Sequence, residues 1–434
     1  FGSSKYEELS HQLRERCIAG LSRYSKISDQ IRSRLEEELS TVTQLGYEPY
    51  FLAVADVASD ARARGIRVAA RGSGAGSLIN YLLGVSGVEP ISNGLLMERF
   101  CSVNRGELPD IDIDVESHRR LEVYDLIFKR FGHERTATVA MVETYRARHA
   151  IRDVGAALGI APMEIDLIAK SLPHIRARNI AKALDNLPEL QGLNLTTPLM
   201  KTAIHLAGKL DGLPRHLSMH PCAVLLSDRS LFDVAPSEIN ASGYPMVPFD
   251  KDDVEVLGLL KLDVLGVRMQ SALTYALQEV KRVDDGDVAL DSVPLDDEQT
   301  FDLIRSTRTL GLFQIESPGQ RELIGKFAPR NFNDLIIDIS LFRPGPVKSD
   351  MITPFLNSRH QWKDRKLIHP SLDAILNETE GVVVFHEQVI RLIAEMTGIS
   401  LAEADERRRQ LGTFESQQEV CDWFFPAAVT HGFD

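Results

Sequence analysis

Two stretches of the chain alternate strictly between polar and apolar residues. The first covers 108–115, where three aspartates alternate with isoleucine or valine. A period of two is that of a β-strand, so this pattern predicts a strand with all three carboxylates on one face. The second covers 258–266, where Lys261 and Asp263 are expected on one face, with leucine and valine on the other. The chain is therefore expected to contain two strands with charged faces.

The remaining apolar periodicity predicts a mixed α/β chain, and 434 residues are enough for more than one domain. Pro344-Gly345-Pro346 is expected to form a rigid turn that holds Arg343 in a set direction. Helices are expected over 5–44, 78–83, 119–131, 145–152 and 269–283, and short strands over 66–70, 136–142, 222–226 and 382–385.

Composition and charge narrow the class of protein. Hydrophobic residues make up 44% and charged residues 26% of the chain, as in ordinary globular proteins. We find no apolar run long enough to span a bilayer and no signal peptide, and we therefore expect a cytoplasmic protein that does not bind a membrane. The four cysteines are scattered, which indicates a reducing compartment and no zinc site. Because the formal net charge is −13, a nucleic-acid partner would have to meet local Lys/Arg patches or metal-screened acids.

The acidic strand needs an explanation because like charges on one face repel each other. Asp110, Asp112 and Asp114 would follow one another at intervals of about 6.5–7 Å. That spacing suits two Mg²⁺ ions about 3.5–4 Å apart, which bind oxygen ligands and stabilise the attacking and leaving oxygens of phosphoryl transfer. Asp263 could complete such a site, and Lys261 could contact a phosphate. The alternatives are a solvated acidic strand, a Ca²⁺ loop and, for the second stretch, an internal Lys–Asp pair.

Residues 71–77, Arg-Gly-Ser-Gly-Ala-Gly-Ser, join a predicted strand to a predicted helix. This is the layout of a phosphate site, in which glycine lets backbone N–H groups approach the anion and the helix N-terminus adds a favourable dipole. Arg71 and Ser73 could add charge-assisted contacts, and Arg99 could reach the same phosphate. The alternatives are a tight packing turn and, for Arg99, a surface ion pair.

Arginine clusters follow in the region after the acidic strand. They suit the backbone of a DNA duplex, because phosphate contacts require charge and carry no sequence information. Solvated helix faces are the alternative for each cluster. The arginines expected to bind DNA are Arg146, Arg148, Arg152, Arg176 and Arg178.

Taken together and in this order, the motifs resemble the catalytic core of the C-family of bacterial DNA polymerases, the group of the polymerase III alpha subunit. The sequences of 110–116, 145–148 and 174–178 are closer to the error-prone, damage-tolerant branch than to the main replicase. The resembling segments are Arg71–Ser73, Pro109–Asp112, Lys261–Gly266, Phe313–Ser317 and Leu341–Pro346.

The resemblance implies a nucleotidyltransferase palm of the polymerase-beta type, a helical thumb and mainly helical, incomplete fingers. Asp110, Asp112 and Asp263 match the family's catalytic ligands for two Mg²⁺ ions, whereas Asp114 matches no catalytic position. The residues implied to bind substrate are the triphosphate-binding pair Gly72 and Ser73, together with Arg71, Arg99, Lys261, Arg343 and His386.

The resemblance also implies the domain organisation. Family members begin with a metal-binding PHP domain and continue into duplex-binding and clamp-binding modules, and we recognise neither in this sequence. We therefore expect a fragment or a reduced form, for which independent activity is an open point. The expected domains are the first part of the palm over 1–141, the thumb over 142–218, the second part of the palm over 219–267 and incomplete fingers over 268–434.

The implied activity is DNA-directed DNA synthesis, in which a primer 3′-hydroxyl attacks the α-phosphorus of a dNTP and pyrophosphate leaves. The implied partners are primer–template DNA, dNTPs and accessory proteins of replication or repair. Two alternatives remain: another nucleotidyltransferase on the same palm that acts on a small acceptor or RNA, and a truncated, catalytically silent fragment.

Overall fold

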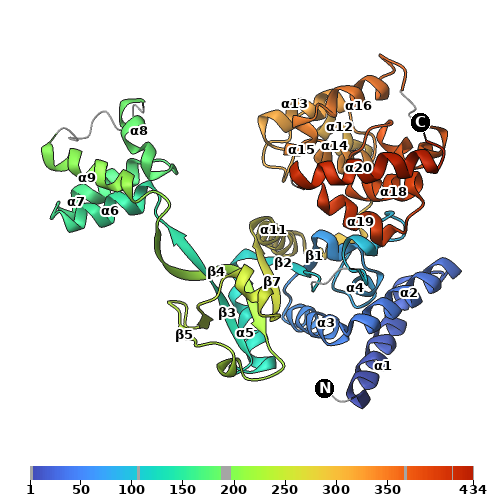
Figure 1. Ribbon diagram of the computed structural model, residues 1–434, viewed down its shortest axis with the longest axis horizontal. Coiled ribbons are helices and arrows are strands. Elements are labelled where there is room, and N and C mark those ends of the chain that lie inside the picture. Colours follow the sequence, from blue (N-terminus) through green and yellow to red (C-terminus); the bar gives the residue numbers. More distant parts are fainter. Residues whose placement is uncertain (1–2, 105–107, 187–196, 366–368, 413, 434) are drawn as a thin grey trace. The chain divides into compact units, whose positions relative to one another are not determined.

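The computed structural model describes residues 3–104, 108–186, 197–365, 369–412 and 414–433. They divide into two compact units, one made of Phe1–Leu126 with Asp263–Asp434 and the other of Ile127–Leu262. Each unit combines strands with helices, so the predicted mixed α/β class is confirmed (Figure 1). Among the helices of the described residues, none combines the length and apolarity needed to cross a bilayer.

The first unit contains three strands that run side by side. Strand β1 (Val68–Arg71) is antiparallel to β2 (Asp112–Glu116), and β2 is parallel to β7 (Leu260–Val267), which enters this unit at Asp263. Ile113 and Val115 of β2 and Leu262 and Val264 of β7 are fully buried, so the aspartates between them lie on the opposite face. The predicted alternation is therefore confirmed in both stretches, although the first strand begins at Asp112 and not at residue 108.

Helices make up most of the rest of the first unit. Leucine and other apolar residues recur along them at helical spacing and form separate buried clusters in the C-terminal half. Before β7 the helices are α1 (Ser3–Gly20), α2 (Asp29–Leu45), α3 (Glu48–Ala63), the short α4 (Leu78–Leu82) and the start of α5 (Arg120–Phe131). After β7 they are α11 (Arg268–Asp284), α12 (Glu298–Arg305), α13 (Pro318–Phe327), α14 (Phe332–Leu341), α15 (Pro344–Lys348), α16 (Ile352–Arg359), α17 (Asp373–Leu376), α18 (His386–Thr397), α19 (Leu401–Gln410) and α20 (Phe414–Thr430).

Two expectations for this half of the chain are wrong. Residues 382–385 do not form a strand, because the side chain of Gln388 accepts the backbone N–H groups of Val384 and Phe385 that a neighbouring strand would bind. The Pro-Gly-Pro sequence does not form an isolated turn but begins α15, with Pro344 at the first helical position. Proline fits there because the first N–H groups of a helix have no partner within it.

The second unit is built on the antiparallel pair β3 (Thr136–Thr144) and β4 (Pro214–Leu226). At one end of this ribbon, four helices pack around a common apolar cluster (Figure 1). At the other end, β3 also pairs with β6 (Pro245–Val247), which pairs with β5 (Glu238–Ile239), so that the strand order is β4–β3–β6–β5. The remaining elements are α6 (Ala147–Ala157), α7 (Pro162–Ser171), α8 (Ile180–Asn186), α9 (Pro198–Lys209) and α10 (Lys251–Val256).

Candidate active site

The parallel pairing of β2 with β7 places two aspartates directly opposite each other. Asp112 is the register partner of Asp263, and adjacent strands lie about 4.8 Å apart. Both side chains are partly buried and lie on the face away from the apolar core. Asp110 is exposed and precedes β2 by two residues. The structure therefore brings two of the three predicted acids together on one face, with the third at the entry to the same strand.

Asp110, Asp112 and Asp263 are called the acidic row below, and the glycine-rich turn begins beside it. Arg71 is the last residue of β1 and the register partner of Asp112. Gly72, the first residue of the turn (η2, Gly72–Gly76), has a φ of +67°, which L-amino acids rarely adopt. A Cβ atom at Gly72 would lie 3.7 Å from Oδ2 of Asp112. Glycine at this position thus leaves open the space between the turn and the carboxylate, and Ser73 follows it.

Asp114, the last aspartate of β2, has a different environment from Asp110 and Asp112. Nε of Arg71 lies 2.9 Å from Oδ1 and 3.0 Å from Oδ2 of Asp114. This ion pair offsets the negative charge of Asp114, so the strand does not need a cation at all three of its acids. It also directs Arg71, which was expected to contact a phosphate, along the strand toward Asp114.

The N-terminus of α4 does not have the role that the sequence pattern suggested. The buried carboxylate of Glu38 accepts the backbone N–H groups of Leu78 and Ile79, and Oγ of Ser77 accepts that of Asn80. These donors are therefore not available to an anion, and the expected contribution of this helix end to phosphate binding is wrong. Backbone groups of the turn itself, from Gly72 onward, are the ones that can approach a phosphate.

A buried tyrosine lies beneath the acids. The hydroxyl of Tyr50, on α3, accepts the backbone N–H of Ile111 at 2.7 Å, and Tyr50 is only 3% exposed. Burial raises the pKa of Tyr50 above its usual range, and the negative charges of Asp110, Asp112 and Asp263 add to this shift. The tyrosine hydroxyl therefore lies within the field of all three acids and fixes the backbone between two of them.

Lys261 is placed by the alternation of β7. It lies two residues before Asp263, and Leu262 between them is fully buried. Successive side chains of a strand point to opposite faces, so Lys261 shares the face of Asp263. A cation at this position can counter negative charge gathered at the acidic row.

A second group of cations lies around the start of α18. Nη1 of Arg99, at the end of η3 (Met97–Arg99), pairs with Oε1 of Glu387 at 2.9 Å. Burial lowers the pKa of His386, and Arg99, Arg408 and Arg343 lower it further, whereas Glu387 raises it. The predicted residues Arg99, Arg343 and His386 therefore lie in one electrostatic cluster. Such a cluster suits a polyanion.

Three residues around the candidate site were not identified from the sequence, namely Arg408 on α19, Glu38 on α2 and Tyr50 on α3. Nη1 of Arg408 lies 3.5 Å from Nδ1 of His386, and the run of three arginines around it was the available signal. Glu38 and Tyr50 act through contacts between helices and residues about 40 to 60 positions away, so no local pattern marks them.

The arginines expected to bind DNA are all in the second unit, and they differ in exposure and in the partners of their side chains. Arg146 is exposed just before α6, and Arg176 and Arg178 are exposed near the carboxylate of Asp211. By contrast, Nε of Arg148 donates to the carbonyl of Leu172 at 2.8 Å. Arg152 likewise pairs with Asp166 at 2.6 Å. Arg146, Arg176 and Arg178 are thus the more accessible charges.

Two adjoining segments of the chain match known protein families. Residues 7–266 match the family described as the bacterial DNA polymerase III alpha NTPase domain. The chain belongs to this family. Residues 269–431 match the bacterial DNA polymerase III alpha subunit finger domain. The family predicted from the motifs is therefore confirmed.

Curated relatives carry names that agree with the predicted branch. The chain is 38% identical over 387 residues to a protein of Symbiobacterium thermophilum named error-prone DNA polymerase, covering 89% of this chain and 35% of the relative. It is 37% identical over 387 residues to a protein of the same name from Pseudomonas fluorescens, covering 88% of this chain and 37% of the relative. The chain thus spans little more than a third of the length of these relatives.

Proposed function

We propose that this chain carries the catalytic core of a DNA-directed DNA polymerase, which transfers a nucleotide from a dNTP to a primer 3′-hydroxyl. The observation that carries the proposal is the direct pairing of Asp112 with Asp263, with Gly72 beside Asp112. Membership of the polymerase III alpha family supports the same activity. The names of the relatives favour error-prone synthesis. We infer that the template can be damaged DNA and that the protein acts in the cytoplasm of a bacterium.

Asp110, Asp112 and Asp263 would hold the two Mg²⁺ ions that the family implies. Asp112 and Asp263 offer carboxylate oxygens from adjacent strands, and Asp110 offers another from an exposed position. Oxygen donors of this kind are what Mg²⁺ prefers. When bound, the ions would neutralise charge on the triphosphate and favour the ionised form of the attacking hydroxyl.

The remaining work of the site is positioning and charge neutralisation by the chain's own residues. The turn from Gly72 to Ser73 would hold the triphosphate next to the acids, and Lys261 would counter its charge. Arg99 and Arg343 would approach it from the region around His386. In the reaction, the primer 3′-oxygen forms a bond to the α-phosphorus and the bond from that phosphorus to the bridging oxygen breaks. Pyrophosphate leaves, and the hydroxyl proton passes to solvent.

Primer extension by an Asp112→Asn variant tests this proposal. The substitution keeps the side-chain shape but removes the charge opposite Asp263, and we expect extension to fall by at least roughly a hundredfold. Asp114→Asn is the matched control, because it lies on the same strand face but its charge is already paired with Arg71. It should retain activity to within about tenfold of the native chain. Equal activities of the native protein and the Asp112→Asn variant would reject the assignment.

A further inference from the structure

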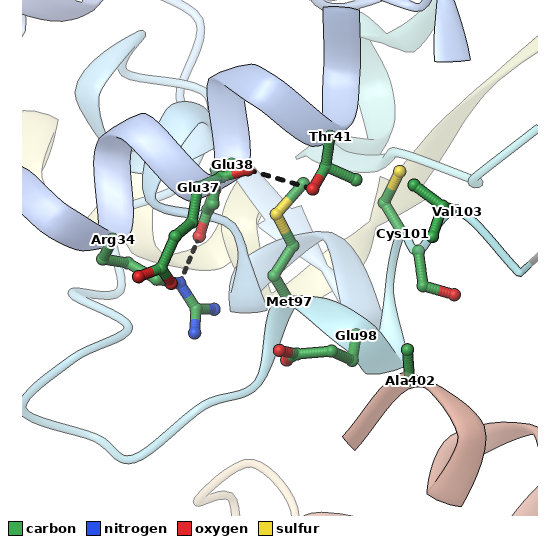
Figure 2. A pocket seen from close by; sticks show the side chains of 10 residues that line it. Arg34, Glu37, Glu38, Thr41, Met97, Glu98, Cys101, Val103 and Ala402 are labelled. Atoms are coloured by element: carbon green, nitrogen blue, oxygen red, sulfur yellow. Dashed lines mark hydrogen bonds and ion pairs between the residues drawn. The ribbon is translucent and has the colours of Figure 1, made fainter. Parts of the chain in front are cut away.

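The carboxylate of Glu38 lies buried between α2 and the end of the glycine-rich turn. It is only 1% exposed, and each of its oxygens accepts two hydrogen bonds. Oε1 accepts Nε of Arg34 at 2.7 Å and the N–H of Leu78 at 3.0 Å. Oε2 accepts Oγ of Ser77 at 2.9 Å and the N–H of Ile79 at 3.2 Å. Figure 2 shows the Arg34–Glu38 pair, one helical turn apart on α2.

The same residues hold the second half of the turn by its carbonyl groups. Nη2 of Arg34 donates to the carbonyl of Gly76 at 3.3 Å, and Nδ2 of Asn80 donates to that of Gly74 at 2.9 Å. A Cβ atom at Gly76 would lie 2.8 Å from the carbonyl oxygen of Leu96, so the turn is also packed closely on its other side. The end of the turn is therefore fixed from several directions, whereas its beginning faces Asp112.

We propose that Glu38 and Arg34 are positioning residues for the nucleotide triphosphate, an inference that rests on the proposed polymerase function. By binding the first N–H groups of α4, Glu38 removes that helix end as a competing anion site. By fixing Ser77 and Gly76, the pair sets the direction in which the turn leaves β1. The backbone of Gly72 and Ser73 is then held beside the acidic row without either residue of the pair touching the nucleotide.

Two substitutions probe this role in different ways. In Glu38→Gln, one acceptor oxygen becomes an amide NH₂ that faces two donors, so at least one of the four hydrogen bonds is lost while the side-chain size is kept. In Arg34→Gln, the ion pair and the contact with Gly76 are lost at a residue whose side chain is 18% exposed. Both residues line a pocket of about 160 Å³ (Figure 2), and neither substitution enlarges a side chain, so no overpacking is expected. Glu37→Gln, an exposed neighbour on α2, is the matched control.

The measurement is the dissociation constant of the complementary dNTP on a complex of the protein with a dideoxy-terminated primer–template. We expect it to rise roughly tenfold in Glu38→Gln and Arg34→Gln, because a hydrogen bond to a charged group is typically worth that factor or more. Primer–template affinity should match the Glu37→Gln control, whereas the thermal midpoint should fall, because buried donors lose their acceptor. The dNTP measurements are therefore made well below the midpoint of each variant. In steady-state extension, KM for the dNTP should rise while kcat changes by less than about threefold, as for loss of uniform binding.

The outcomes separate this inference from the proposed function. Unchanged dNTP affinity in both variants, with the native protein binding dNTP, would overturn the positioning role alone. Failure of the native protein to bind dNTP in the presence of primer–template would overturn the proposed function. If Glu38→Gln does not fold, Arg34→Gln decides, since its side chain is more exposed and its loss leaves no new donor against Leu78.

Discussion

Tyr50 is a residue whose single hydroxyl connects α3 to the backbone between two of the acids. Its ring is buried, and its oxygen is the acceptor for the N–H of Ile111. Removing that oxygen leaves a buried donor without a partner, which typically costs about 1–3 kcal/mol. The cost is local, because the tyrosine ring and its packing are kept in phenylalanine.

We therefore expect Tyr50→Phe to loosen the entry to β2 without unfolding the protein. Hydrogen exchange measured by mass spectrometry on peptides covering 108–116 should accelerate by roughly five- to a hundredfold, while peptides from the second unit stay unchanged. Tyr81→Phe, a partly exposed tyrosine on α4, serves as the control. Unaltered exchange over 108–116 would show that the hydrogen bond to Ile111 does not hold this segment.

For a single residue, the sequence predicts the face of the strand on which its side chain lies. It does not predict contacts with residues far along the chain. Alternation identified the side of the strand on which Asp112 lies, because the period of two is a local property. Tyr50 and Glu38 carry no comparable signal, since their partners lie far along the chain and their identity depends on how helices pack. For the same reason, no local pattern predicts the ion pair between Arg71 and Asp114. The contact of Arg71 with a phosphate stays a prediction.

Among the elements, α14 carries a buried acid that none of the proposed chemistry uses. Asp338 is fully buried, and its Oδ2 accepts Nε2 of Gln320 from α13. Burial raises the pKa of Asp338 to about 7, and Gln320 and Arg359 act in the opposite direction. The folded protein thus holds a proton on this side chain over a pH range in which the unfolded chain, with the ordinary value of 3.8, has lost it.

This difference makes the stability of the helical region depend on pH. The contribution is fully present below pH 3.8 and is lost as the pH rises toward about 7, because the unfolded chain binds fewer protons in that window. Asp338→Asn should remove this component, so its thermal midpoint should fall less than that of the native protein between pH 4 and 7. Identical pH profiles for the two proteins would contradict a shifted Asp338.

Element prediction succeeded where local pattern decides structure and failed where a side chain intervenes. The faces of β2 and β7 and the extent of α11 agree with expectation, since alternation and helical spacing are local. The apolar run at 382–385 has the composition of a strand, but Gln388 occupies its backbone donors. The sequence pattern does not reveal this interaction, because it depends on where α18 begins.

For the whole molecule, the question is how a chain with a net charge of −13 would bind the DNA that the proposed reaction requires. Binding to a phosphate backbone depends on local cations, each of which releases counterions and contributes about 0.9 to the salt slope. Arg146 and Arg178 are exposed in the second unit and belong to the predicted duplex-binding set. Arg229, also exposed in that unit but outside the set, provides a comparison.

We expect the double variant Arg146→Gln, Arg178→Gln to bind primer–template more weakly and with a salt slope smaller by about 2. Fluorescence anisotropy at several salt concentrations measures both quantities. Arg229→Gln should change the slope by much less. A slope that is the same for the double variant and the native protein would remove these arginines from the interface.

The arrangement of distant segments is the part of the fold that local pattern does not predict. β2 and β7 are separated by some 150 residues, and neither pattern specifies that the two strands pair. That Asp263 could join Asp112 was a hypothesis from the residue types, which the family resemblance supported. The predicted boundaries of palm, thumb and fingers stay predictions. The two compact units of the structure meet along the chain after Leu126 and after Leu262, and these divisions do not test the boundaries of three domains. Long-range parallel pairing depends on the whole chain, which is why a short window cannot specify it.

The most direct test is anomalous diffraction from crystals of the protein with Mn²⁺, a dideoxy-terminated primer–template and the matching dNTP. The proposed site predicts manganese peaks bound by the carboxylates of Asp112 and Asp263, with the triphosphate against the backbone of Gly72 and Ser73. Manganese bound elsewhere, or a nucleotide lodged away from this turn, would contradict the two-cation site and with it the proposed chemistry.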